Sequence, residues 1–131
     1  MSALFWVAVG SAIGGMGRYW CSGAIARRYG ERFPWGTFFV NVVGSFVIGL
    51  FSGWGPDGTD LVDPGIRQFV MAGICGGYTT FSSFSLQTQN LMKDGEWLYA
   101  GANVGISVAL CLVAVWVGVI LASAVNAMEL G

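Results

Sequence analysis

Four long apolar segments dominate the pattern of hydrophobic and polar positions, at about residues 3–26, 37–54, 66–92 and 98–125. Each is long enough to cross a bilayer as a helix, which takes roughly 20 residues. The third contains Gly76-Gly77-Tyr78-Thr79-Thr80, and glycine and β-branched threonine are poor helix formers. The pattern predicts an all-α integral membrane protein, a single domain over residues 1–131. It has four transmembrane helices, and the third is broken near residues 76–80.

Most of the charge lies between these segments. The loops carry Arg27, Arg28, Glu31 and Arg32; then Asp57, Asp60 and Asp63; then Lys93, Asp94 and Glu96. Aromatic residues of the kind that anchor helices at membrane interfaces lie near the segment ends: Trp20, Tyr29, Trp35, Trp54, Trp97 and Tyr99. With four helices, the first and third loops lie on the same side of the membrane. Together they carry four Lys or Arg residues, whereas the opposite side has only Arg67. The positive-inside rule places these loops in the cytoplasm and both termini outside.

Composition narrows the class of protein further. Only 10% of the 131 residues are charged and 55% are hydrophobic, whereas soluble domains carry about 25% charged residues. The net charge is −1, so there is no basic patch to bind nucleic acid. The chain has no histidine, which excludes a histidine-ligated haem. Three widely spaced cysteines are interpreted as small apolar residues.

Polar residues inside apolar segments are hypotheses for function, because they cost free energy in lipid unless they are paired. The first segment has Arg18, interpreted either as a side chain that reaches the interface or as a charge that attracts anions. The second has Asn41, and the fourth has Asn103 and Ser107 on one helix face. These residues either line a pore or hydrogen-bond between helices. The segment cores contain no Asp or Glu, which argues against proton- or cation-coupled transport.

The third segment combines aromatic and hydroxyl side chains after its glycines. Phe81 and Phe84 are three positions apart and share a face, with Ser82 and Ser85 beside them. The edge of a phenyl ring is its positive side, so this face is suited to an anion; the alternative is packing against another helix. A break here would also free backbone carbonyls, which suit a hard cation such as Na⁺.

The run Gly76-Gly77-Tyr78-Thr79-Thr80-Phe81-Ser82-Ser83-Phe84-Ser85 resembles the G-G-x-T-T-F-S-[ST]-F-S signature of the Fluc family of bacterial fluoride channels, also called CrcB proteins. The likeness covers essentially the whole chain. Arg18 behind Gly10 and Gly14 matches the first-helix motif, and Pro34-Trp35-Gly36-Thr37 with Asn41 and Gly44 matches the second. The fourth helix is the weakest match, and spacing alone places Asn103 and Ser107 there.

The resemblance implies an antiparallel, dual-topology homodimer in the bacterial plasma (inner) membrane, with two fluoride pathways along its interface. The residues it assigns to the pathway are Phe81, Phe84, Asn41, Ser82, Ser83, Ser107 and Thr37. It also implies that Arg18 holds charge in a vestibule. A structural Na⁺ on the twofold axis would be bound by the backbone carbonyls of Gly76 and Thr79. The implied function is passive export of F⁻, which protects the cell from fluoride.

Two other classes of protein compete with this interpretation. A small four-helix drug or cation transporter is expected to carry a membrane-embedded carboxylate in its first helix, where this protein has Arg18. A non-conducting assembly subunit of a larger membrane complex is the second alternative. An enzyme is the least favoured, because the residues offer no nucleophile–base pair and no metal cluster.

Overall fold

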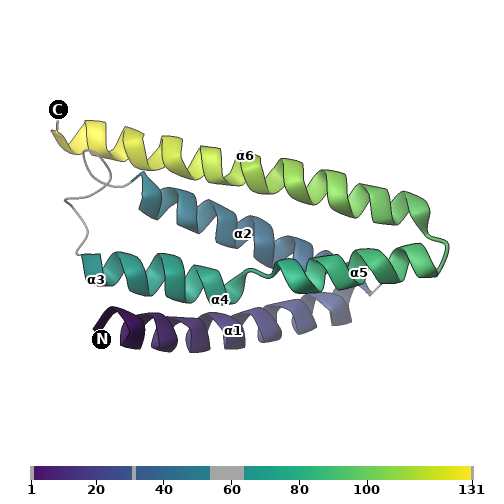
Figure 1. The fold of residues 1–131 in the computed structure, drawn as a ribbon. Coiled ribbons are helices and arrows are strands. Elements are labelled where there is room, and N and C mark those ends of the chain that lie inside the picture. Colours follow the sequence, from purple (N-terminus) through teal and green to yellow (C-terminus); the bar gives the residue numbers. More distant parts are fainter. Residues whose placement is uncertain (1, 31, 54–63, 131) are drawn as a thin grey trace.

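The computed structural model describes residues 2–30, 32–53 and 64–130, and within these ranges the chain is helical and contains no strand. The helices are α1 (Ser2–Tyr29), α2 (Trp35–Ser52), α3 (Pro64–Arg67), the π-helical segment η2 (Gln68–Cys75), α4 (Gly76–Tyr78), α5 (Phe81–Lys93) and α6 (Trp97–Leu130). In Figure 1, α3, η2 and α4 form one rod that α5 continues, so the described residues make four long passes. The prediction of an all-helical protein with four long helices is confirmed.

The third rod is interrupted at two residues. Thr79 (φ −84°, ψ 157°) and Thr80 (φ −152°, ψ 121°) are extended, between helices that end at Tyr78 and restart at Phe81. Gly76 and Gly77 remain helical, although the Gly-Gly pair marked the expected region of the break. Packing explains this, because a Cβ on Gly77 would lie 2.6 Å from the Ser11 carbonyl oxygen of α1. Close contact with α1 outweighs a propensity cost of about 1 kcal/mol per glycine.

Glycines allow the helices to approach one another closely. A Cβ on Gly10 would lie 2.5 Å from the Phe69 carbonyl oxygen, and one on Gly14 would overlap the Ile74 carbonyl oxygen. Gly10 and Gly14 therefore form a close helix contact, and their partner is the first half of the third rod. Between α2 and α6, a Cβ on Gly53 would lie 2.9 Å from the Val119 carbonyl oxygen. Such small-residue contacts are typical of packing between membrane helices.

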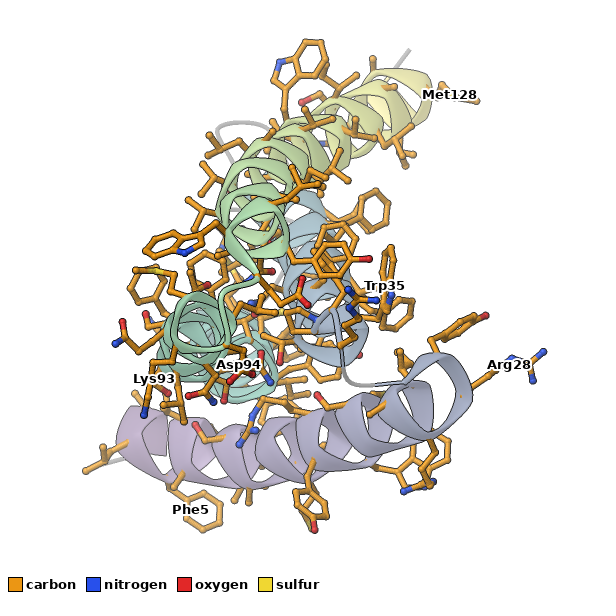
Figure 2. The ribbon with its side chains drawn as sticks, turned by 90° about the vertical axis from the view of Figure 1, so that its right-hand side faces the viewer. Phe5, Arg28, Trp35, Lys93, Asp94 and Met128 are labelled. Atoms are coloured by element: carbon orange, nitrogen blue, oxygen red, sulfur yellow. The ribbon has the colours of Figure 1, made fainter. Side chains whose placement is uncertain are left out.

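The exterior of the bundle is apolar. Two helices, α2 over Trp35–Ser52 and α6 over Trp97–Met128, are long and apolar enough to span a membrane. Only 28% and 17% of their most apolar stretches are buried in the described structure, whereas the core helix of a soluble protein is mostly buried. Figure 2 shows side chains such as Phe5 and Met128 pointing away from the bundle. This surface is typical of a protein surrounded by lipid.

The first and third loops lie together at one end of the bundle, and the described ends of α1 and α6 near the two termini lie at the other (Figure 1). Arg32 Nη2 is 3.1 Å from Glu96 Oε1, and the Arg32 guanidinium lies 5.0 Å from the centre of the Tyr99 ring. The predicted common side of these loops is confirmed. Some predicted positions lie outside the described residues. They are Trp54, which was predicted to end the second helix at the membrane interface, and the acidic loop residues Glu31, Asp57, Asp60 and Asp63.

Candidate functional site

An open groove of about 350 Å³ lies at the break in the third rod. Side chains and backbone from α2, η2, α4, α5 and α6 line it: Asn41, Gly44, Ser45, Ile48, Cys75, Gly76, Thr79, Thr80, Phe81, Phe84, Ser107, Val108 and Cys111. The groove therefore brings together six of the residues singled out in the sequence: Asn41, Gly76, Thr79, Phe81, Phe84 and Ser107. None of the described residues that line it is acidic or basic.

Asn41 of α2 holds the break in place. Its Nδ2 donates to the Thr80 carbonyl oxygen at 3.1 Å, and its Oδ1 accepts from the Thr80 N–H at 2.8 Å. The amide thus gives the Thr80 N–H the acceptor that it lost at the break, and it adds a second donor to the Thr80 carbonyl. A carboxamide has two N–H donors, so the second one remains available to the groove. The interhelical hydrogen bond considered from the sequence is confirmed, and the role of Asn41 in a pore stays a prediction.

The break also frees carbonyl oxygens. In a continuous α-helix the Thr80 N–H would donate to the Gly76 carbonyl, but it donates to Asn41 instead. In the same way, the Ser83 N–H donates to Thr80 Oγ1 at 3.2 Å, as in an N-cap, and not to the Thr79 carbonyl. Gly76 and Thr79 therefore carry carbonyls without their helical donors beside the groove. Neutral oxygen ligands of this kind fit a hard cation such as Na⁺.

The two phenylalanines form a tilted pair with ring centroids 5.5 Å apart and an interplanar angle of 42°. Phe84 is 9% exposed and packs inside the bundle, whereas Phe81 is 76% exposed at the edge of the groove. Ser82 is exposed, and its hydroxyl oxygen lies 3.2 Å from Thr80 Oγ1. Ser82 is not among the described residues that line the groove.

A series of hydrogen bonds joins α6 to α5 behind the groove. Ser107 Oγ donates to Asn103 Oδ1 at 3.3 Å, and Asn103 Nδ2 donates to Thr88 Oγ1 at 2.8 Å. Thr88 Oγ1 in turn donates to the Phe84 carbonyl oxygen at 2.8 Å. The interhelical hydrogen bond considered from the sequence is therefore confirmed for Asn103, whereas Ser107 bonds within its own helix and lines the groove. Thr88 was not identified from the sequence. Its only indication was a hydroxyl four positions after Phe84, a spacing at which threonine can bond to a helix carbonyl.

A second cleft, of about 690 Å³, lies at the end that carries the first and third loops. It holds three of the other four predicted site residues, Arg18, Thr37 and Ser83, and the fourth, Ser82, lines neither cavity. The acidic residues Asp94 and Glu96 also line it, and Figure 2 shows Lys93 and Asp94 side by side at this end of α5. Gln87, another lining residue missed in the sequence, has a buried Oε1 without a hydrogen-bond partner in the described part of the protein. The predicted site is thus divided between a neutral groove and a charged cleft.

Comparison with known proteins finds relatives over nearly the full length. A family model described as CrcB-like protein, Camphor Resistance (CrcB), matches residues 5–119. The sequence is 55% identical over 130 residues to the fluoride-specific ion channel FluC of Opitutus terrae, with 98% of both proteins covered. It is 56% identical over 121 residues to the FluC of Paramagnetospirillum magneticum, covering 92% of this protein and 94% of the relative. It is 52% identical over 125 residues to the FluC of Methylocella silvestris, with 95% of both covered.

Proposed function

The chain belongs to the CrcB-like protein family, and on that premise we propose that it is a passive, fluoride-selective ion channel that exports F⁻ from the cytoplasm. The observation that carries the proposal is the identity of 55% over 98% of both proteins with one named fluoride-specific ion channel. The groove supports it, because it combines the amide, hydroxyl and aromatic groups expected for a small anion. The channel protects the cell by lowering its internal fluoride.

The chemistry of the groove suits fluoride. This ion is small and strongly hydrated, so a pathway must replace its water with good donors. The second N–H of Asn41 and the positive edges of Phe81 and Phe84 supply them, and Ser107 adds a hydroxyl to the lining. No carboxylate among the described lining residues repels the anion. Arg18 in the second cleft concentrates anions at that end.

Passive conduction is sufficient for this task. In acidic surroundings fluoride enters a cell as neutral HF and ionises inside, where the pH is higher. The internal F⁻ concentration then exceeds the external one, and a channel lets it leave down its gradient. The groove needs no coupled proton, and this agrees with the absence of acidic residues from its described lining. The ion-channel class is also distinct from any class of enzyme.

We further propose that the functional unit is an antiparallel homodimer in the bacterial inner membrane. The support is the open groove together with the 76% exposure of Phe81, since a second copy would cover the ring and close the pathway. The Gly76 and Thr79 carbonyls of both copies would hold a structural Na⁺ between them. When bound, this ion would compensate carbonyl oxygens that have lost their helical donors.

Two alternatives remain distinguishable from a fluoride channel. A drug or cation transporter would bind its cation with a carboxylate in the membrane, which the described lining of the groove lacks. A non-conducting assembly subunit would move no ion when it is purified alone. Each alternative therefore predicts a different result in reconstituted vesicles.

Ion efflux from liposomes tests the proposal. Vesicles containing the purified protein are loaded with fluoride or chloride, and efflux is started with a potassium ionophore and followed with ion-selective electrodes. We expect fast fluoride efflux and no chloride efflux above protein-free vesicles. Absence of fluoride efflux from correctly inserted protein would overturn the proposal and favour the assembly subunit.

A further inference from the structure

The series of hydrogen bonds behind the groove has a fixed direction. The Phe84 carbonyl can only accept, so Thr88 must donate its single proton to it. Thr88 can then only accept from Asn103, which requires the Asn103 NH₂ to face Thr88 and Oδ1 to face Ser107. Oδ1 can only accept, so Ser107 must donate to it. The Phe84 carbonyl therefore determines where the proton of Ser107 points, three hydrogen bonds away.

This direction conflicts with anion binding at Ser107. Ser107 has one proton, and that proton is committed to Asn103, so its oxygen presents lone pairs to the groove. Lone pairs repel an anion. For Ser107 to donate to fluoride, its hydroxyl must rotate away from Asn103 Oδ1.

The geometry makes that rotation easy. The Ser107–Asn103 bond is 3.3 Å long, whereas a good O–H···O bond is about 2.7–2.8 Å. The other two bonds in the series are 2.8 Å each and hold Asn103 firmly. Asn103 is 1% exposed, so its Oδ1 has no access to bulk water as a replacement donor. The series thus has a rigid anchor and one weak final bond.

We propose that Asn103 is a positioning residue that sets the proton direction of Ser107. With the groove empty, Ser107 donates to Asn103 Oδ1; with fluoride present, the hydroxyl rotates and donates to the ion. Asn103 Oδ1 is then left without a donor, and this cost limits how long the ion stays. The inference rests on the proposed function, because it assigns Asn103 a role in fluoride passage through the same groove.

Two substitutions should release the Ser107 proton. Asn103→Leu removes the acceptor with little change in volume. Thr88→Val removes the anchor and lets the Asn103 amide turn over, while Thr88→Ser is the matched control that keeps the hydroxyl. Because Asn103 is buried, Thr88→Val also provides a test if Asn103→Leu does not fold.

The readout is the fluoride concentration that half-saturates efflux from liposomes. We expect Asn103→Leu and Thr88→Val to lower it by about 2- to 10-fold, the factor that one neutral hydrogen bond is worth. Thr88→Ser should behave as wild type. In a Ser107→Ala background both effects should disappear, because Asn103 acts through Ser107. Equal effects with and without Ser107 would overturn the inference and leave Asn103 a purely structural residue.

A spectroscopic measurement separates this inference from the proposed function. The carboxamide carbonyl stretch of isotope-labelled Asn103 should move to higher frequency when fluoride is added, as Oδ1 loses its donor. The shift should be absent in Ser107→Ala. A wild-type protein that conducts fluoride without this shift would overturn the inference alone. A wild-type protein that conducts no fluoride would overturn the proposed function and the inference with it.

Discussion

At the scale of single residues, the groove depends on side chains that do two things at once. Asn41 holds the backbone of Thr80 with both ends of its amide and keeps one N–H free. Thr80 caps α5 through its Oγ1, which accepts from the Ser83 N–H. Phe84 packs inside the bundle while its carbonyl anchors Thr88. Substitutions here are therefore expected to affect stability and conduction to different degrees, and the two must be measured separately.

Phe81→Ile is expected to reduce fluoride efflux by about tenfold or more, equivalent to about 1.4 kcal/mol in the barrier. The reason is the loss of the positive ring edge at the groove. Phe81 is 76% exposed, so the fold should be retained, and size-exclusion chromatography should show the same assembly as wild type. Phe5→Ile, which alters an exposed ring on α1 outside the groove, is the control. Unchanged efflux in Phe81→Ile would remove this ring from the pathway.

Asn41→Asp is also expected to reduce efflux by about tenfold or more. The carboxylate can still accept from the Thr80 N–H, but it places a negative charge in a groove that the anion must enter. Asn41→Leu, which removes the amide without adding charge, separates the two effects. The measurement is efflux together with infrared detection of the ionised carboxylate. Normal efflux while the introduced carboxylate is ionised would contradict the placement of this amide in the pore.

At the scale of the helices, close packing decides features that local propensity does not. The first half of the third rod lies against α1 through glycines on both sides, so the Gly-Gly pair stays helical. The rod opens only at Thr79 and Thr80, where Asn41 offers substitute hydrogen bonds. The break is thus fixed by a partner on another helix as much as by its own sequence.

Gly14→Ala is expected to destabilise the protein by about 1–3 kcal/mol, as overpacking does. The new methyl group would overlap the Ile74 carbonyl oxygen, which belongs to backbone and cannot move aside. Gly15→Ala is the matched control, because a Cβ there meets nothing within 4 Å. That control should gain about 0.5–1 kcal/mol from helix propensity. Thermal unfolding in detergent measures both, and equal stability of the two variants would contradict the close packing of α1.

The elements were more predictable from the sequence than the site. Long apolar segments indicated the helices, and poor helix formers indicated the region of the break. The sequence could not show that Asn41 reaches Thr80, because these residues are 39 positions apart and meet only through packing. The sequence also assigned Ser82, Ser83 and Thr37 to the pathway and Arg18 to a vestibule, but it could not show that Ser83, Thr37 and Arg18 meet at a second cleft. A motif gives the order of residues but not the surface to which each one turns.

At the scale of the whole molecule, two arguments about insertion lead in opposite directions. The end with the first and third loops carries four basic residues, Arg27, Arg28, Arg32 and Lys93, whereas the other end has Arg67. This asymmetry favours a single orientation in the membrane. An antiparallel homodimer requires both orientations. The ion pair between Arg32 and Glu96 does not remove the conflict, because the rule counts basic residues and not net charge.

We expect both orientations in the cell. An Asp94→Cys variant, with Cys21, Cys75 and Cys111 replaced by serine, places one thiol in an exposed position after α5 and leaves the basic residues unchanged. A membrane-impermeant maleimide applied to intact cells should label the copies whose thiol faces outward. The remaining copies should be labelled only after the cells are permeabilised. Labelling from one side only would exclude the antiparallel dimer and leave a parallel assembly.

The central claim, passive and fluoride-selective conduction, is tested most directly by the reversal potential across a planar bilayer. The purified protein separates two solutions that contain the same cation at the same concentration and differ in their ratio of fluoride to chloride. The account predicts a current whose reversal potential follows the fluoride gradient when the fluoride concentration is changed on either side. A reversal potential that followed chloride or the cation, or the absence of any current, would contradict it.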